Sequence, residues 1–225
     1  MNKEQAVNNL DIVITNVEAA RLSLSDHHIV KIVAISKYNN EDDIEALYHA
    51  GQRAFGENKV QDLKEKSANL DDTPIEWHFV GRLQKNKINN LIDLNPALMH
   101  SLDSLELAIE LDKKLEAKSK KMNCLLQINS ALEESKAGVN PDEAISIYSE
   151  VIERCPNINL KGIMSIGAHV DDEEKIKQSF ETTKNIYDQL INKGAKYCSM
   201  GMSSDYELAI KCGSNMIRVG SSLFK

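Results

Sequence analysis

The stretch KIVAISKYNNEDDIEALYHAG, residues 31–51, contains one complete strand and helix unit and sets the interpretation of the whole chain. Its apolar run 32–35 is short and rich in β-branched residues, which predicts a buried strand over 31–36. The acidic residues 41–43 and the apolar spacing after them predict a helix over 41–50 that ends at Gly51. Lys37 stands between the two elements, although lysine is seldom taken out of water. A lysine at the tip of a buried strand needs an explanation from its surroundings.

The same alternation of strand and helix continues along the chain. Strands are predicted over 31–36, 53–56, 76–81, 97–101, 123–129, 160–166, 196–200 and 215–219. Helices are predicted over 3–24, 41–50, 58–69, 84–93, 104–119, 141–153, 172–193 and 204–212. Eight such units predict an α/β fold, a single (β/α)8 TIM-like barrel in which an extra N-terminal helix takes the place of the last helix. A doubly wound sheet is disfavoured because no G-x-G-x-x-G motif follows the first strand.

Composition limits the class of protein. The 225 residues are 42% hydrophobic and 27% charged, and no linker or low-complexity tract divides them, so we expect one domain over 1–225. The net charge of −7 argues against nucleic acid as a partner. Strand-sized apolar runs and the absence of a signal-peptide pattern predict no membrane partner and a cytoplasmic location. Four cysteines without a CxxC pair are expected to be reduced structural thiols, and we expect a monomer.

In such a barrel the functional residues lie where the strands end. Those ends carry Lys37, Glu57, Asn58, Arg82–Gln84, Ser165, 201–203 and 218–221. Two of them predict a phosphate site. GMSSD, residues 201–205, offers Ser203 at a helix start, and RVGSS, residues 218–222, offers close backbone approach at Gly220 and a hydroxyl at Ser221. The alternative is that the serines and the aspartate only cap a helix.

Lys37 and Arg218 suggest a carbonyl cofactor. Lysine beside another cation loses basicity, and its free amine then attacks an aldehyde to form a Schiff base, the chemistry of pyridoxal phosphate. Arg218 interrupts an apolar strand, and pyridoxal-phosphate sites place an Asp or Arg opposite the pyridine nitrogen. Two alternatives stay open: Lys37 is a solvated loop residue, or Arg218 forms an internal salt bridge with Glu57 or Glu76.

The order of these motifs resembles a known family. VAISKYN around Lys37, FGENKVQD (55–62), EWHFVGRLQKNK (76–87) and SMGMSSDYELAIKCGSNMIRVGSSLF (199–224) are similar to segments of the pyridoxal-phosphate homeostasis protein family. Its members are single-domain barrels related to the N-terminal domain of bacterial alanine racemase. The resemblance implies that Lys37 holds pyridoxal 5′-phosphate as a covalent aldimine and that Arg218 faces the ring nitrogen. It implies that Ser203, Gly220 and Ser221 bind the phosphate and that Asn58 contacts the ring or its 3-hydroxyl.

Two functions follow from the resemblance. The first is a pyridoxal 5′-phosphate-binding protein that buffers or delivers the cofactor to apo enzymes without clear catalytic turnover. The alternative is an amino-acid racemase-like enzyme, which needs an acid or base on each face of the cofactor. We find no second group for that role, and Tyr38 is expected to point away from Lys37. A sugar-phosphate enzyme with Lys37 as an aldolase-type base is a third possibility from the phosphate site alone.

Other motifs receive less specific interpretations. The histidines show no metal-ligand spacing, and His78 is expected to be a core or barrel-lining residue. The basic segment 81–87 is expected to be a solvated surface, and the acidic segment 171–175 a helix start. LEESK, residues 132–136, resembles a loop of the family but receives no chemical role.

Overall fold

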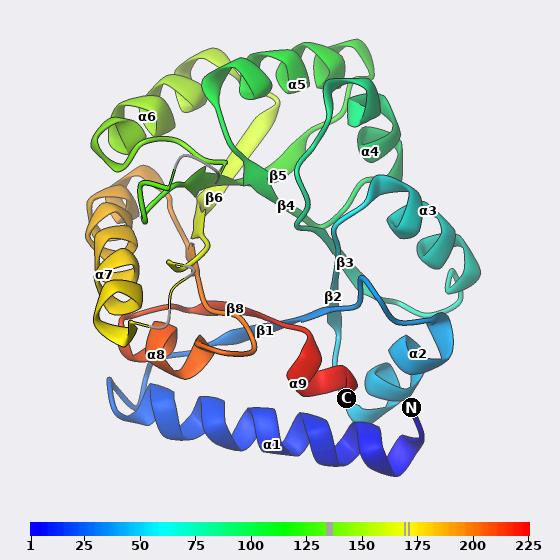
Figure 1. Ribbon diagram of the computed structural model, residues 1–225. Helices are drawn as coiled ribbons and strands as arrows, with labels where there is room; N and C mark the ends of the chain where they lie inside the picture. Colours follow the sequence, from blue (N-terminus) through cyan, green and yellow to red (C-terminus); the bar gives the residue numbers. More distant parts are fainter. Residues whose placement is uncertain (134–136, 169, 171) are drawn as a thin grey trace.

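Eight parallel strands close into a barrel in sequence order, and the first strand pairs with both the second and the last (Figure 1). The computed structural model describes residues 1–133, 137–168, 170 and 172–225. The strands are β1 (Lys31–Ile35), β2 (Ala54–Glu57), β3 (Glu76–Phe79), β4 (Leu98–Leu102), β5 (Met122–Ile128), β6 (Ile158–Ser165), β7 (Tyr197–Ser199) and β8 (Met216–Val219). The predicted (β/α)8 barrel is confirmed, with strand boundaries that differ from the prediction by one or two residues.

The helices form a ring outside the strands (Figure 1). They are α1 (Lys3–Leu22), α2 (Glu41–Ala50), α3 (Val60–Asn69), α4 (Ile88–Leu94), α5 (Leu105–Ala117), α6 (Ala144–Arg154), α7 (Glu173–Leu190), α8 (Tyr206–Lys211) and α9 (Ser221–Phe224). Three predicted helices begin or end in short 3-10 turns, which are Lys85–Lys87, Pro141–Glu143 and Ile191–Lys193. Gly51 ends α2 with a φ of 125°, as predicted for a glycine at this place.

The first helix takes the place of a final helix, as predicted. It buries Leu10, Val13 and Val17 and packs against α2, α8 and α9, so it covers the side of the barrel where β1 meets β8 (Figure 1). The four-residue helix α9 follows β8 directly and was not predicted, because four residues are too few to show a helical period.

The barrel has a packed interior. Inward side chains of alternate strand positions form one apolar cluster, made of Val33, Ala54, Leu98, Leu125, Met164 and Met216. Larger clusters fill the space between the strands and the helices. Because the lower interior is filled, open space is left at the C-terminal ends of the strands, where this fold builds its sites.

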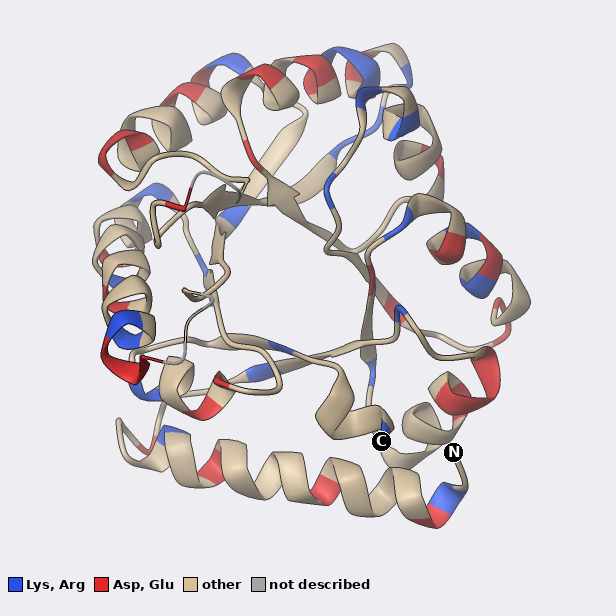
Figure 2. Ribbon diagram, viewed as in Figure 1, with Lys and Arg blue, Asp and Glu red and all other residues tan. Residues whose placement is uncertain are grey.

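Surface chemistry agrees with the composition. Acidic and basic segments alternate around the ring of helices (Figure 2). No helix within the described residues has the length and apolar character needed to cross a bilayer. All four cysteines are free, and three of them, Cys124, Cys155 and Cys198, are buried.

Candidate cofactor site

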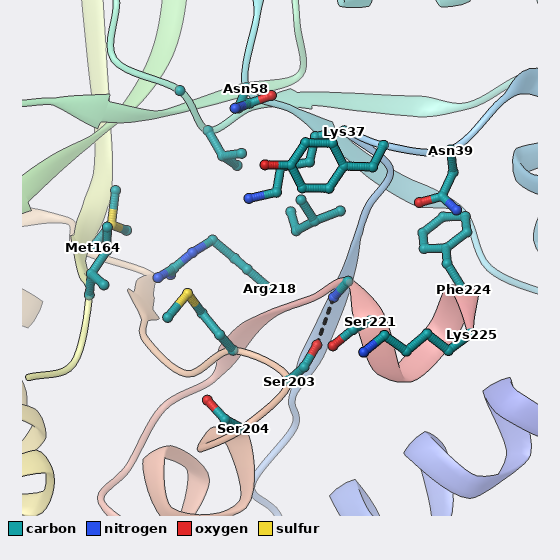
Figure 3. Close-up of a pocket in the computed structure, with 17 residues that line it drawn as sticks. Lys37, Asn39, Asn58, Met164, Ser203, Ser204, Arg218, Ser221, Phe224 and Lys225 are labelled. Atoms are coloured by element: carbon teal, nitrogen blue, oxygen red, sulfur yellow. Dashed lines mark hydrogen bonds between the residues drawn. The ribbon is translucent and has the colours of Figure 1, made fainter. Parts of the chain in front are cut away.

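A cavity of about 800 Å³ opens at the C-terminal ends of the strands, and we call it the mouth pocket (Figure 3). Its size is in the range of small-molecule sites. All six predicted site residues line it: Lys37, Asn58, Ser203, Arg218, Gly220 and Ser221. They come from the ends of β1, β2, β7 and β8, so the structure brings together segments from both ends of the chain. Their individual roles stay predictions.

Lys37 leaves the barrel wall in the turn after β1 and is exposed to solvent. Its Nζ lies 4.8 Å from the centre of the Tyr38 ring, and no carboxylate among the described residues forms a salt bridge with it. The prediction that Tyr38 points away is wrong, because Tyr38 lines the same pocket while remaining 86% exposed. Strand alternation suggested the opposite direction, but β1 ends at Ile35, and in the turn beyond it neighbouring side chains need not alternate.

Arg218 lies on β8 with 5% of its surface exposed and reaches the floor of the mouth pocket (Figure 3). Its guanidinium donates to the Ser199 hydroxyl at 2.7 Å and to the Ser165 carbonyl oxygen at 2.8 Å. Burial lowers the pKa of Arg218 to about 10, opposed by the negative charge of Asp205, so the side chain stays charged at neutral pH. This pattern leaves a fixed positive charge facing the pocket.

The alternative partners of Arg218 are engaged elsewhere. Glu57 accepts from Lys66 at 2.7 Å, and Glu76 pairs with Lys31. The alternative that was left open, an internal salt bridge from Arg218 to either carboxylate, is not found. Each carboxylate pairs instead with a lysine of another element, Lys66 on α3 or Lys31 on β1.

Ser203 connects the two loops of the predicted phosphate site. Its hydroxyl oxygen accepts from the backbone N–H of Gly220 at 3.0 Å, marked in Figure 3, and from that of Ser222 at 3.4 Å. Ser203 does not cap α8, the helix that follows it, but its two donors lie at the N-terminus of α9, so the helix that it caps is α9. The loop turns at Gly201, where φ is 97° and a Cβ would come 2.7 Å from the Ala209 Cβ. Two backbone donors thus converge on one oxygen at the edge of the pocket.

Asn58 follows β2 and has a buried Oδ1 with no hydrogen-bond partner among the described residues. The loop after β3 packs tightly on its backbone, because a Cβ at Gly81 would lie 1.8 Å from the Asn58 carbonyl oxygen. A buried polar atom without a partner is unfavourable unless a ligand or a water satisfies it. The side chain therefore offers an acceptor to whatever fills the pocket.

Some residues at strand ends lie outside the pocket. Arg82 is exposed and faces Asp103 at 3.6 Å, and the Ser165 hydroxyl accepts from Thr183 behind the barrel wall. Sequence reasoning missed other pocket residues, among them Asn39, Met164, Ile166 and Phe224. Met164 on β6 and Ile166 just beyond its end lie on either side of Ser165, so an inward period of two was the available signal. Phe224 belongs to α9, which is too short to show a helical period.

The histidines within the described residues do not form a metal site. No group of three or more His, Cys, Asp or Glu side chains in the described ranges is placed to hold a metal ion. His78 is a buried barrel residue, as predicted, and its Nδ1 lies 2.7 Å from His100 Nε2 while its Nε2 lies 3.0 Å from Glu76. The loop 132–136 and the acidic segment 171–175 fall partly on residues 134–136 and 171, which lie outside the described residues.

Comparison with known proteins places this geometry in a family. The family model described as alanine racemase, N-terminal domain, matches residues 9–225. The pyridoxal phosphate homeostasis protein of Helicobacter pylori is 56% identical over 216 residues, which cover 96% of each chain. The chain belongs to the pyridoxal phosphate homeostasis protein family. Two solved structures extend the comparison to three dimensions.

The first is PipY of Synechococcus elongatus with PLP bound, which has a TM-score of 0.81 and 29% identity and covers 98% of this chain and 100% of its own. The second is an alanine racemase of Clostridium difficile, with a TM-score of 0.77 and 18% identity over 96% of this chain and 59% of its own. At that identity the racemase shows a shared fold alone. The Helicobacter pylori relative and PipY therefore match this chain along nearly its whole length, whereas the match to the racemase covers 59% of the racemase chain.

Proposed function

We propose that the chain binds pyridoxal 5′-phosphate in the mouth pocket and buffers or delivers it, without clear catalytic turnover of its own. The observation that carries the proposal is the position of Lys37 and Arg218, whose cationic ends face the same cavity (Figure 3). The names of the homeostasis relatives and the PLP in the PipY structure support the choice of ligand. When bound, the cofactor supplies an aldehyde that condenses with a lysine amine and releases one water.

The pocket residues fit the remaining groups of this cofactor. Arg218 presents a permanent donor, which suits an unprotonated pyridine nitrogen and weakens the ring as an electron sink. The Ser203 oxygen, on which two backbone N–H groups converge, lies beside the Ser221 hydroxyl, and we assign a phosphate to this edge. The unpartnered Oδ1 of Asn58 suits a hydroxyl donor on the ring.

The exposure of the reactive side chain supports a carrier. Lys37 and Tyr38 are both exposed, so water and an incoming amine have access to them. Enzymes that form carbanions from amino acids exclude water from the reacting centre. An apo enzyme's lysine is such an incoming amine, and we propose apo pyridoxal-phosphate enzymes as the recipients. We further propose a monomer that acts in the cytoplasm, where its four free cysteines stay reduced.

The test has two arms. Protein incubated with pyridoxal 5′-phosphate turns yellow, and borohydride reduction fixes the cofactor on Lys37, as located by peptide mass spectrometry; Lys37→Ala abolishes both signals. In the second arm, the loaded protein restores activity to an apo pyridoxal-phosphate enzyme. A colourless protein with no adduct overturns the binding proposal. Multiple-turnover release of deuterium from α-deuterated amino acids, lost in Lys37→Ala, overturns the carrier in favour of a racemase-like enzyme.

A further inference from the structure

A buried ion pair lies directly behind the wall of the mouth pocket. The Lys66 Nζ on α3 is 2.7 Å from Glu57 Oε1 at the end of β2, and the Glu57 side chain has no exposed surface. A Cβ at Gly56 would meet Ile35 and Val33, so position 56 faces the barrel interior. Glu57, the next residue, faces the opposite way, toward the helices. The pair therefore lies outside the barrel and does not line the cavity.

Both members of the pair also bind Ser36. Lys66 donates a second hydrogen bond to the Ser36 carbonyl oxygen at 2.8 Å, and the Ser36 hydroxyl donates to Glu57 Oε1 at 2.6 Å. The Ser36 backbone N–H donates to the Gly56 carbonyl oxygen at 3.0 Å. Ser36 is thus fixed through its N–H, its hydroxyl and its carbonyl, and it is the residue immediately before Lys37.

Glu57 is also adjacent to a second residue of the mouth pocket. Glu57 immediately precedes Asn58, and its own carbonyl oxygen accepts from the Val80 N–H at 2.9 Å. One carboxylate at the tip of β2 therefore connects the peptide before Lys37 with the peptide before Asn58. Glu57 Oε2 is buried and has no hydrogen-bond partner in the described part of the chain.

Stability alone does not account for this arrangement. Taking two charges out of water is unfavourable, and apolar residues of similar volume often serve a fold as well or better. The matched ion pair at the opposite end of the barrel, Lys31–Glu76, keeps 30% and 39% of its side-chain surface exposed. The more deeply buried pair, with 11% and 0% of its side-chain surface exposed, thus lies at the end of the barrel where Lys37 and Asn58 line the cavity.

We infer that Glu57 and Lys66 are positioning residues that fix the direction in which Lys37 leaves β1 and hold Asn58 in register with it. This inference rests on the proposed function, since it concerns the reach of Lys37 toward a bound aldehyde. The pair touches neither the ligand nor the reacting atoms. A displacement of about 1 Å at a reacting group lowers reactivity by up to about a hundredfold, so a fixed carbonyl at Ser36 has a measurable effect.

The test compares two ligands that differ at one carbon. Pyridoxal 5′-phosphate carries the aldehyde that reacts with Lys37, whereas pyridoxine 5′-phosphate carries an alcohol and binds only through the ring and the phosphate. In Lys66→Met we expect covalent loading by the aldehyde to weaken about tenfold to a hundredfold, while affinity for the alcohol changes less than about twofold. Lys66→Arg, which keeps the charge and the donors, restores much of the loading.

Two further variants keep the test decisive. The double variant Glu57→Met/Lys66→Met leaves no buried unpaired charge, so it folds even where the single variant does not, and it should show the same selective loss. Lys31→Met removes the lysine of the other ion pair and should leave both affinities unchanged. Amide hydrogen exchange without ligand should accelerate at residues 36–38 and 57–58 in the double variant and remain slow in the other strands.

The outcomes separate the two proposals. A wild-type protein that forms no adduct overturns the proposed function. Hydrogen exchange without ligand still tests whether Glu57 and Lys66 fix Ser36. An equal loss of affinity for pyridoxal 5′-phosphate and for pyridoxine 5′-phosphate, or no loss of affinity for either, overturns the positioning role. Unchanged exchange at residues 36–38 in the double variant overturns it as well.

Discussion

The Nζ of Lys37 lies 4.8 Å from the centre of the Tyr38 ring, and both side chains stand at the mouth of the barrel. An ammonium over an aromatic face is attracted by the ring quadrupole. We propose that this contact is given up when the Lys37 amine turns toward a bound aldehyde.

Removal of that contact should therefore change the rate of covalent loading at Lys37. We expect Tyr38→Ala to accelerate covalent loading of Lys37 by about twofold to fivefold, which is the size of an exposed cation–π contact. Tyr38→Phe keeps the ring and should load at the wild-type rate. Stopped-flow absorbance measures both. Slower loading in Tyr38→Phe would show that the Tyr38 hydroxyl takes part in the reaction, which a contact with the ring alone does not predict.

Arg218→Met should change the titration of the bound cofactor. The fixed charge of Arg218 opposes protonation of a neighbouring ring nitrogen, so its removal raises the pKa of that nitrogen and shifts the pH dependence of the absorption band upward. Affinity should fall about tenfold because a charge-assisted donor is lost. Spectra recorded between about pH 5 and 9, within the stable range of most proteins, give the result. An unchanged titration would mean that Arg218 serves only Ser199 and Ser165.

Ser203→Ala removes the oxygen on which two backbone N–H groups converge. We expect the free energy of unfolding to fall by about 1 kcal/mol, the usual net value of a neutral hydrogen bond. The preference for pyridoxal phosphate over pyridoxal, measured by equilibrium titration, should fall about tenfold, because phosphate recognition is charge-assisted. Ser204→Ala, at the exposed neighbouring position, is the matched control. Equal preference in wild type and Ser203→Ala would place the phosphate elsewhere.

The interior chain Glu76–His78–His100 predicts sensitivity to acid. Burial lowers the pKa of His78, against the effect of Glu76, and lowers that of His100 well below its usual value. Both rings are neutral in the folded and unfolded states above about pH 6.5. Below that pH the unfolded chain takes up protons that the folded chain does not, so stability falls as pH falls.

The expected slope is at most about 1.4 kcal/mol per pH unit for each histidine. The hydrogen bond from His78, with that from Lys31, lowers the pKa of Glu76 to about 2 against the effect of burial. The stability that this provides is lost as pH falls from 4.5, the ordinary pKa of a glutamate, toward 2. Urea unfolding at several pH values should show a smaller slope between about pH 6.5 and 5 in His78→Gln/His100→Gln than in wild type. Identical slopes would exclude the pair as the source.

The fold and the residues of the mouth pocket were accessible from the sequence because their signals are local. Each strand is a short apolar run, and one rule, that parallel strands of a barrel end at the same face, brings Lys37, Asn58 and Arg218 together. That rule needs no side-chain coordinates. It also predicted Arg82 and Ser165 at the same face, and the structure places both outside the pocket.

The remaining features depend on tertiary contacts that no local pattern records. Lys66 belongs to a polar helix, where a lysine is expected to be solvated. Its partners are instead the Glu57 carboxylate on a strand and the Ser36 carbonyl oxygen, 30 residues away. Tyr38 lies in a turn, where the period of two no longer fixes its direction. The partners of Arg218 come from β6 and β7, so only the closed barrel reveals them.

The pairing of β1 with β8 has a consequence for the synthesis of the protein. Lys37, just after β1, is translated long before Arg218 on β8, and β1 and β8 are neighbours only after the barrel has closed. A chain still growing on the ribosome has no wall on the β8 side of its site until residues 216–221 have emerged. We therefore expect no capture of pyridoxal 5′-phosphate before residues 216–221 have joined the barrel.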